Sequence, residues 1–186
     1  DNENQLRRSL ALALDALSRS DDHSVDVLLT TVLEEAERVR RHGVPLGLIE
    51  AQAEAIGVPL RVVRVPPAAS NATYEAALER ALAPLRAEGI RTVATGDLHL
   101  SDIRAYREAL LERLGAEPHF PIWTDDTSAL AESFIDRSYR AVISSVDTTQ
   151  LDPSFAGRWF DASLLADLPA GVDPCGENGE FHTFVT

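Results

Sequence analysis

Lysine and methionine are both absent from this chain of 186 residues. All 17 basic residues are therefore arginine, and 30 acidic residues leave a formal net charge of −13. This surplus of acid argues against nucleic acid as a partner, because phosphates bind to basic faces. An acidic protein can still bind a nucleotide locally, through Mg²⁺ and backbone N–H groups.

Cysteine and long apolar runs are also scarce. The single cysteine, Cys175, excludes an intrachain disulfide and suits a reducing compartment, so we expect a cytoplasmic protein. No apolar run approaches the roughly 20 residues that span a bilayer, and no signal peptide opens the chain, so no membrane partner is expected. Cys175 could act as a nucleophile, but a role as a small turn residue is favoured because no base is predictable beside it.

Helices and strands alternate over the first two thirds of the chain. Apolar spacing predicts an opening helix from Leu6, with Leu10 on its inward stripe. Later helices are predicted at 45–56, with Ile56 on its apolar face and Gly57 as its exit, after Ser70 and after Ser101. Strands are predicted at 25–31, 60–65 and 90–94. This order predicts an α/β fold with a Rossmann-like, doubly wound parallel sheet. Tyr106 lies on an apolar stripe and is expected in the core.

The regular alternation of strands and helices ends near residue 118, where an extended segment that contains two prolines begins. A short helix capped by Thr127, a strand at 141–146, a brief helix after Asp161 and a last strand at 181–185 follow. We therefore predict two domains, a Rossmann-like nucleotide-binding domain at 1–117 and a smaller α/β acceptor-substrate domain at 118–186.

Three short segments follow the predicted strands and helices of the first domain. In parallel sheets, ligands bind beyond the carboxyl ends of the strands. That rule places Thr30-Thr31, His42-Gly43 and Thr95-Gly96-Asp97 on one rim, as site candidates by position.

The last polar stretch, residues 173–183, holds the cysteine, two glycines, two glutamates and a histidine. Gly176 and Gly179 permit turns that let polar groups converge. Glu177 and Glu180 could accept hydrogen bonds from a cationic or amine-bearing ligand, and His182 could donate or accept. The alternative is a polar hairpin that leads into the last strand.

Several separated motifs resemble those of the diphthine–ammonia ligase family, within the PP-loop ATP pyrophosphatases. The resemblance runs from about Ser9 to the last residue. The motifs are Arg41-His42-Gly43, residues 50–54, Gly96-Asp97-Leu98, Tyr106-Arg107-Glu108, Pro121-Ile122-Trp123, Asp126-Thr127 and residues 176–183.

This resemblance implies a fold like that of the adenine nucleotide alpha hydrolases and an ATP-dependent ligase. Such an enzyme adenylates a carboxylate with ATP and Mg²⁺, and ammonia then attacks the activated acyl group. The residues implied are Arg107 and Glu180 for catalysis; Ser9, Thr30, His42, Gly43, Gly96 and Asp97 for the nucleotide; and Trp123, Gly176, Glu177, Asn178, Gly179, Glu180, His182 and Thr183 for the acceptor. Arg107 could instead be a solvated helix residue, and Trp123 could simply be buried.

One departure from the family is marked. The family opens with a strand and an S-G-G-K-D-S loop that wraps phosphates, whereas the matching residues here run from Asn4 to Ser9 and only Ser9 agrees. Either the native N-terminus is missing from this sequence, which the absent methionine favours, or the chain is a relative with altered or lost ATP chemistry. The second reading leaves a non-catalytic nucleotide- or ligand-binding protein as the alternative function.

The remaining expectations concern partners. An alanine- and arginine-rich composition without lysine suggests a bacterial source, in which the acceptor is a small-molecule or protein-bound carboxylate other than diphthine. Five scattered histidines form no helical ligand pair, so no metal site is predicted within the chain. A homodimer is left open.

Overall fold

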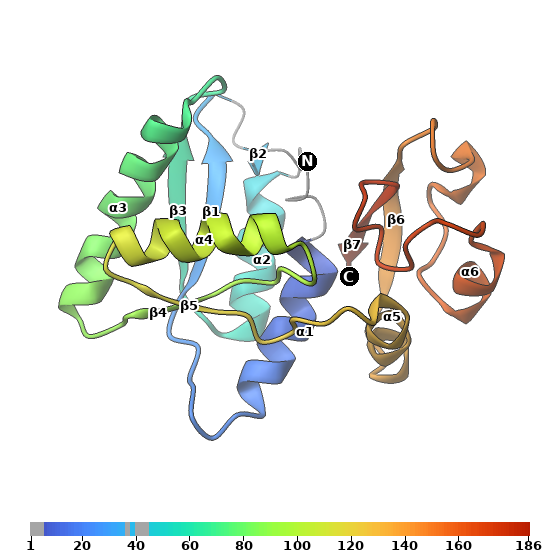
Figure 1. The fold of residues 1–186 in the computed structure, drawn as a ribbon, viewed down its shortest axis with the longest axis horizontal. Helices are drawn as coiled ribbons and strands as arrows, with labels where there is room; N and C mark the ends of the chain where they lie inside the picture. The colour runs from blue at the N-terminus through green and yellow to red at the C-terminus, as the bar shows by residue number, and fades with distance from the viewer. Residues whose placement is uncertain (1–5, 36–37, 40–44) are drawn as a thin grey trace. The chain divides into compact units, whose positions relative to one another are not determined.

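The computed structural model describes residues 6–35, 38–39 and 45–186 (Figure 1). These residues fall into two compact units. Unit 1 comprises the described residues of 1–16, 95–101 and 120–186, and unit 2 comprises those of 17–94 and 102–119. The domain boundary predicted between residues 117 and 118 stays a prediction.

Unit 2 contains a three-stranded sheet in the order β2-β1-β3. β1 (Leu28–Leu33) pairs in parallel with β3 (Leu60–Val65), from Leu28 opposite Leu60 to Leu33 opposite Val65. β2 (Arg38–Val39) pairs with β1 in the antiparallel sense. The predicted strand at 60–65 is confirmed, whereas β1 begins three residues later than the predicted 25–31. Its first ladder contact is the Leu28 N–H, which donates to the Pro59 carbonyl oxygen at 2.8 Å.

Among its described residues, unit 2 also has three helices and a second small sheet. α2 (Leu46–Ile56) ends at Gly57, whose φ of 76° matches the predicted glycine exit. α3 (Asn71–Ala87) begins at Ser70, whose side chain accepts from the Thr73 N–H, and it packs beside β3 (Figure 1). α4 (Ser101–Arg113) lies between β4 (Thr92–Ala94) and β5 (Glu117–His119) in the chain, and these two strands pair in parallel.

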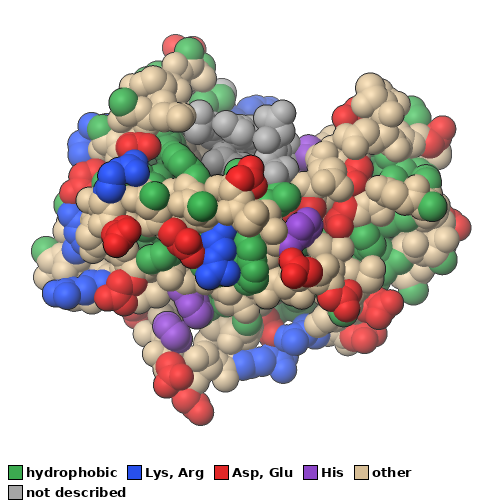
Figure 2. All heavy atoms as spheres, in the orientation of Figure 1, with side chains coloured by type: hydrophobic (Ala, Val, Ile, Leu, Met, Phe, Trp, Pro, Cys, Tyr) green, Lys and Arg blue, Asp and Glu red, His purple; other side chains and the backbone are tan. Residues whose placement is uncertain are grey.

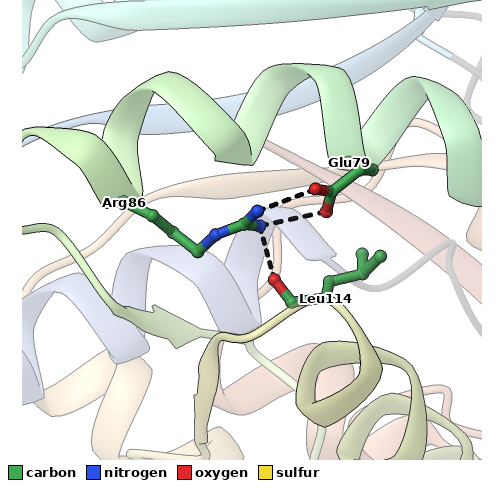
Figure 3. Close-up of polar contacts among 3 residues, drawn as sticks. All are labelled: Glu79, Arg86 and Leu114. Atoms are coloured by element: carbon green, nitrogen blue, oxygen red, sulfur yellow. Dashed lines mark hydrogen bonds and ion pairs between the residues drawn. The ribbon is translucent and has the colours of Figure 1, made fainter.

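Arg86 ties the end of α3 to the end of α4. Its guanidinium donates to both carboxylate oxygens of Glu79, at 3.0 and 2.7 Å, and also to the carbonyl oxygen of Leu114 (Figure 3). Because carbonyls at a helix end lack partners within the helix, Arg86 satisfies one just past the last turn of α4.

Unit 1 holds the opening helix up to Ala16 and the C-terminal third of the chain. α1 (Leu6–Ser18), α5 (Thr127–Asp136), the short 3₁₀ helix η2 (Pro153–Phe155) and α6 (Ala162–Asp167) accompany β6 (Ala141–Val146) and β7 (Phe181–Val185), which pair in the antiparallel sense. The strands at 141–146 and 181–185 are confirmed. Their core includes Leu12, Leu98, Phe134, Ile143, Phe160, Leu164 and Phe181, all less than 5 % exposed.

Tertiary packing corrects several predicted faces. Tyr106 is 39 % exposed and Ile56 is 50 % exposed, so neither is a core residue. Leu10, expected on the inward face of α1, is 37 % exposed, and Arg8, Ser9 and Leu12 are buried instead. The cap of α5 is Asp126, which accepts from the Ala129 N–H at 2.9 Å, and Thr127 is the first helical residue.

The fold is therefore mixed α/β, with small sheets in the part of the chain that the structure describes. Acidic and basic side chains are interspersed over the face drawn in Figure 2. Among the described residues, none of the helices has the length and apolar character needed to cross a membrane.

Candidate functional site

The polar stretch before β7 folds into two tight turns, and we call residues 173–180 the closing loop. The Gly176 N–H donates to the Asp173 carbonyl at 2.7 Å, and the Gly179 N–H donates to the Gly176 carbonyl at 3.0 Å. Gly176 has a φ of +68°, and a Cβ there would lie 2.9 Å from the Phe181 carbonyl oxygen. Only glycine fits this position without displacing backbone, so the turn predicted from the two glycines has a steric cause.

Two carboxylates hold the closing loop from within. Asp173 accepts from the N–H groups of Cys175 at 2.7 Å and Glu177 at 3.3 Å, and from the Thr127 hydroxyl at 2.8 Å. Glu180 accepts from the Asp173 N–H at 2.9 Å. It also accepts from the backbone N–H and the side-chain amide of Asn178, at 3.0 and 3.1 Å. Both Glu180 oxygens are therefore bound within the loop, and the predicted catalytic role of Glu180 stays a prediction.

Arg8 of α1 reaches the loop from the other end of the chain. Its Nη2 donates to the Cys175 carbonyl oxygen at 2.7 Å, and its guanidinium lies over the Phe160 ring, 4.0 Å from the centroid. Arg8 is 2 % exposed, and its Nη1 has no hydrogen-bond partner among the described residues. Burial lowers the pKa of Arg8 from its usual value, although nearby Glu177 and Asp173 oppose that shift. A buried cation with a free N–H is poised to bind an oxygen atom.

Glu177 differs from Glu180, although both are buried. Glu177 is 5 % exposed, and its carboxylate has no hydrogen-bond partner within the described part of the chain. Burial raises the pKa of Glu177 to about 8, with further raising contributions from Asp173, Asp97 and Glu180 and a lowering one from Arg8. The group therefore titrates near neutral pH, as acid–base groups in active sites do.

The segment after β4 lies against the first turns of α1. A Cβ at Gly96 would lie 3.1 Å from the carbonyl carbon and the Cβ of Ser9, so the backbones approach as closely as a glycine allows. Ser9 is 2 % exposed. The Thr95 hydroxyl and His99 Nδ1 are buried without a hydrogen-bond partner among the described residues. Asp97 acts electrostatically on Glu177, which places the segment near the closing loop.

The other predicted site residues are placed as follows. Trp123 is half-buried in unit 1, with its ring edge-on to Phe120. Thr183 is buried in β7, and burial lowers the pKa of half-buried His182. Thr30 lies inside β1 rather than at its carboxyl end, so the positional reason for choosing it was wrong.

The remaining predicted residues belong to unit 2. Arg107 lies on α4 and is half-buried. His42 and Gly43 lie outside the described residues. The nucleotide-binding and catalytic roles of all these residues stay predictions.

Cys175 sits at the centre of the closing loop as a structural residue. It is 2 % exposed, and its thiol donates to the Thr127 carbonyl oxygen at 3.3 Å. Burial raises the pKa of this thiol to about 11, so little thiolate forms at neutral pH. This environment favours the predicted turn role over nucleophilic catalysis.

The roles of Arg8 and Asp173 in the closing loop were not predicted from the sequence, whereas Thr95 was a site candidate by its position. Arg8 could have been found from helical spacing, because it lies four and five residues before the buried Leu12 and Ala13. Asp173 precedes a proline and carries no local signal of its contact with Thr127, which is 46 residues away in the chain.

The closing loop, Arg8 and residues 95–97 thus form one group within unit 1. It combines a loop ordered by two carboxylates, a buried guanidinium with a free donor and a second glutamate that titrates near neutral pH. Such a group can bind a ligand that carries both an oxygen acceptor and an amine, and it can move a proton. No set of three or more His, Cys, Asp or Glu residues suited to a metal ion occurs in the described ranges.

Two family models match the chain in order. The model of the diphthamide synthase N-terminal domain matches residues 9–118, more than half of the chain, and that of the diphthamide synthase C-terminal domain matches residues 126–186. The resemblance drawn from the motifs is thereby confirmed. A comparison with curated proteins found no match. Domains of this kind suggest an enzyme that works in the manner of the PP-loop ATP pyrophosphatases.

Proposed function

Because the chain belongs to the diphthamide synthase family, we propose that it is an ATP-dependent ligase that converts a carboxylate into an amide with ammonia. The observation that carries the proposal is the match of both domains of the family, in order, along this one chain. The group formed by Arg8, Glu177 and residues 95–97 supports it, because it joins donors for oxygen atoms to an acceptor for an amine.

A carboxylate becomes a good acyl donor only when one of its oxygens is turned into a leaving group. Bound ATP supplies that change, by transfer of its adenylyl group to the carboxylate. The protein must hold the two reactants together and stabilise developing charge. Mg²⁺ remains part of the proposal as the partner of the nucleotide phosphates.

The described residues fit an adenine nucleotide and a carboxylate. The buried Thr95 hydroxyl lacks a partner among them and can bind a nucleotide oxygen. The free Nη1 of Arg8 can donate to the acceptor carboxylate, while Nη2 stays on the Cys175 carbonyl oxygen. The closing loop holds the Arg8 guanidinium through the Cys175 carbonyl, and Asp173 and Glu180 fix the backbone of that loop.

The family resemblance and the composition support further proposals about the sheet, the source, the acceptor and Arg107. We propose that the strands of unit 2 belong to a Rossmann-like sheet and that the protein works in a bacterial cytoplasm. The acceptor is then a carboxylate other than diphthine. Arg107 is proposed to bind phosphate or the acceptor carboxylate.

A second function is favoured by one observation. Arg8 and Ser9, which match the end of the family's phosphate loop, are buried, and Arg8 is bound to the closing loop and stacked on Phe160. A chain that uses these residues for packing could bind a ligand without turning ATP over. This alternative is a binding protein of the same fold.

Calorimetric titration of the chain with Mg²⁺–ATP, with AMP for comparison, tests the proposal. We expect saturable ATP binding that Thr95→Val weakens roughly 2- to 10-fold, the range for one lost hydrogen bond. Thr92→Val is the matched control, because Thr92 is exposed on the same stretch of chain. Arg107→Ala and its control Arg113→Ala, on the same helix, test the second expected contact.

The outcomes separate the two functions. ATP binding followed by AMP formation that depends on both ammonium and an added carboxylate supports the ligase. ATP binding without AMP formation across a panel of carboxylates supports the binding protein. Absence of ATP binding, with the folded state verified by circular dichroism, contradicts the ligase.

A further inference from the structure

Glu177 is a buried acid of the candidate site, and no described group of the closing loop donates a hydrogen bond to its carboxylate. Its own backbone N–H is held by Asp173, at 3.3 Å, and the next residue is held by Glu180, at 3.0 Å. The backbone is thus anchored on both sides of the residue. With 5 % of the residue exposed, Glu177 receives no hydrogen bond on its carboxylate from the described residues. Its oxygens are not among the fully buried atoms that lack a partner, so a small ligand can reach them.

The charges that face Glu177 define what that partner must be. Asp173 and Glu180 act on it from its own loop, Asp97 from the segment after β4, and Arg8 from α1. Among the described side chains that act on Glu177, three are carboxylates and one is a guanidinium. Arg8 is already bound to the Cys175 carbonyl oxygen and stacked on Phe160, so it compensates only part of this negative charge. A further anion at Glu177 is disfavoured by repulsion, whereas a small cation with N–H donors suits both the charge and the missing hydrogen bonds.

We propose that Glu177 binds the attacking amine in its ammonium form and accepts one of its protons. This inference rests on the proposed amide-forming reaction and assigns the residue that prepares its nucleophile. It concerns a step and a residue different from the acceptor contacts proposed for Arg8.

An N–H bond of ammonium breaks and an O–H bond forms on the Glu177 carboxylate, which leaves neutral ammonia with a free electron pair. That pair forms the C–N bond to the activated acyl carbon. The C–O bond to the adenylate breaks, its electrons leave on the phosphate oxygen of AMP, and the amide nitrogen loses its second proton to water. Glu177 returns its own proton to solvent before the next cycle.

The acid–base properties of the site support this assignment. A carboxylate with an ordinary pKa is too weak a base to take a proton from ammonium efficiently, because the ideal catalytic pKa lies near the working pH. Burial and the neighbouring carboxylates bring the pKa of Glu177 to about 8. The same environment binds the ion, and the same anchored backbone holds the proton acceptor in place.

The test uses ammonium chloride as the probe and needs neither ATP nor the acceptor. Protein labelled with ¹³C at the glutamate carboxyls is titrated by NMR between pH 5 and 9, in ammonium chloride and in potassium chloride at equal ionic strength. Ammonium that binds only ionised Glu177 lowers its apparent pKa, by about one unit at ten times the dissociation constant. The signal is assigned from its loss in Glu177→Gln, or from its displacement in Glu177→Asp if the first variant does not fold.

Two controls make the comparison specific. Exposed Glu132 on α5 is followed in the same spectra and must titrate alike in both salts. Tetramethylammonium chloride supplies a cation without N–H donors and is expected to behave as potassium does. The proposal is overturned if the apparent pKa of Glu177 is the same in all three salts. The same pKa in ammonium and potassium chloride, but a higher one in tetramethylammonium chloride, would mean a site for small cations in general and also overturns it.

Failure of this inference is distinguishable from failure of the proposed function. An ammonium-specific shift without ATP binding leaves the ammonium site in place and removes the ligase reading. ATP binding and turnover without the shift keep the ligase and remove Glu177 as its proton acceptor. If turnover is found, Glu177→Gln is expected to remove the rise of kcat/KM for ammonium with pH near 8, the acidic limb of the profile, a readout that a merely structural role would not move.

Discussion

Three N–H groups point at the carboxylate of Glu180, whereas none in the described part of the chain points at that of Glu177. Both residues are buried, and they stand three positions apart in one loop. Hydrogen bonds to the ionised form make Glu180 a fixed anion that orders the turn. Without such bonds, burial outweighs the opposing charge of Arg8 at Glu177 and favours its protonated form.

Glu177 therefore makes the stability of the protein depend on pH. Its pKa is about 8 in the folded protein and roughly 4.3 in an unfolded chain. Between these values the folded state binds more protons than the unfolded state, so the contribution of Glu177 to stability falls as pH rises from about 4.5 to 8. Glu177→Gln imitates the protonated form, and we expect the variant to gain stability relative to the unmodified protein across this range.

Urea denaturation of both proteins at pH 5 and pH 8 measures this effect. The stability difference between the variant and the unmodified protein is compared at the two pH values. The lowered pKa of His182 makes stability fall as pH falls, but it does so equally in both proteins and cancels in this difference. Glu132→Gln, at an exposed position, is the matched control and should show no relative gain. If the stability of Glu177→Gln relative to the unmodified protein falls between pH 5 and pH 8, the raised pKa assigned to Glu177 is contradicted.

Single elements of this chain could be predicted where local signals set their limits. The strands at 60–65, 141–146 and 181–185 are correct to the residue, and α2 and α3 have the predicted glycine exit and serine cap. β1 was placed three residues too early because its start is set by its partner: pairing begins where Pro59 and Leu60 present the neighbouring strand. Periodicity within a segment carries no information about that partner.

The junction between α3 and α4 gives a prediction at the scale of elements. Arg86 binds Glu79 within α3 and the Leu114 carbonyl just after α4 (Figure 3). The ion pair lowers the pKa of Glu79 and raises that of Arg86. Arg86→Ala removes the link between the helices and leaves the Leu114 carbonyl without this donor, so we expect a lower urea midpoint.

Arg113→Ala is the matched control for Arg86→Ala. Arg113 pairs with Glu75 across the same two helices, at 2.9 Å, but its side chain is 56 % exposed against 26 % for Arg86. Exposed pairs contribute little, because water and salt screen them. We expect a clearly smaller loss of stability for Arg113→Ala, and equal losses would mean that the Leu114 contact contributes nothing.

At the scale of the whole molecule, net charge is the dominant electrostatic feature. A formal charge of −13 makes the folded state repel itself, and the repulsion is relieved as the chain expands on unfolding. Salt screens these interactions over about 8 Å at physiological ionic strength. The exposed ion pairs, such as Arg104–Glu108 and Arg158–Asp167, lose attraction on screening, but each is worth little.

We therefore expect added sodium chloride to stabilise this protein. The urea midpoint should rise between 10 mM and about 0.5 M salt, as screening removes repulsion among the acidic side chains. The measurement is repeated in potassium chloride, so that an effect of one cation is recognised. A midpoint that falls with both salts would show that the ion pairs outweigh the self-repulsion.

The sequence by itself determined the family, the α/β class and the turn at Gly176, because each depends on residue types at short spacing along the chain. Only the tertiary structure decided how the closing loop is used. The contact of Arg8 with Cys175 joins residues 167 positions apart, and the contact of Thr127 with Asp173 joins residues 46 apart. Glu177 and Glu180 look alike in sequence, and only the direction of neighbouring N–H groups distinguishes the proposed proton acceptor from the anion that holds the loop.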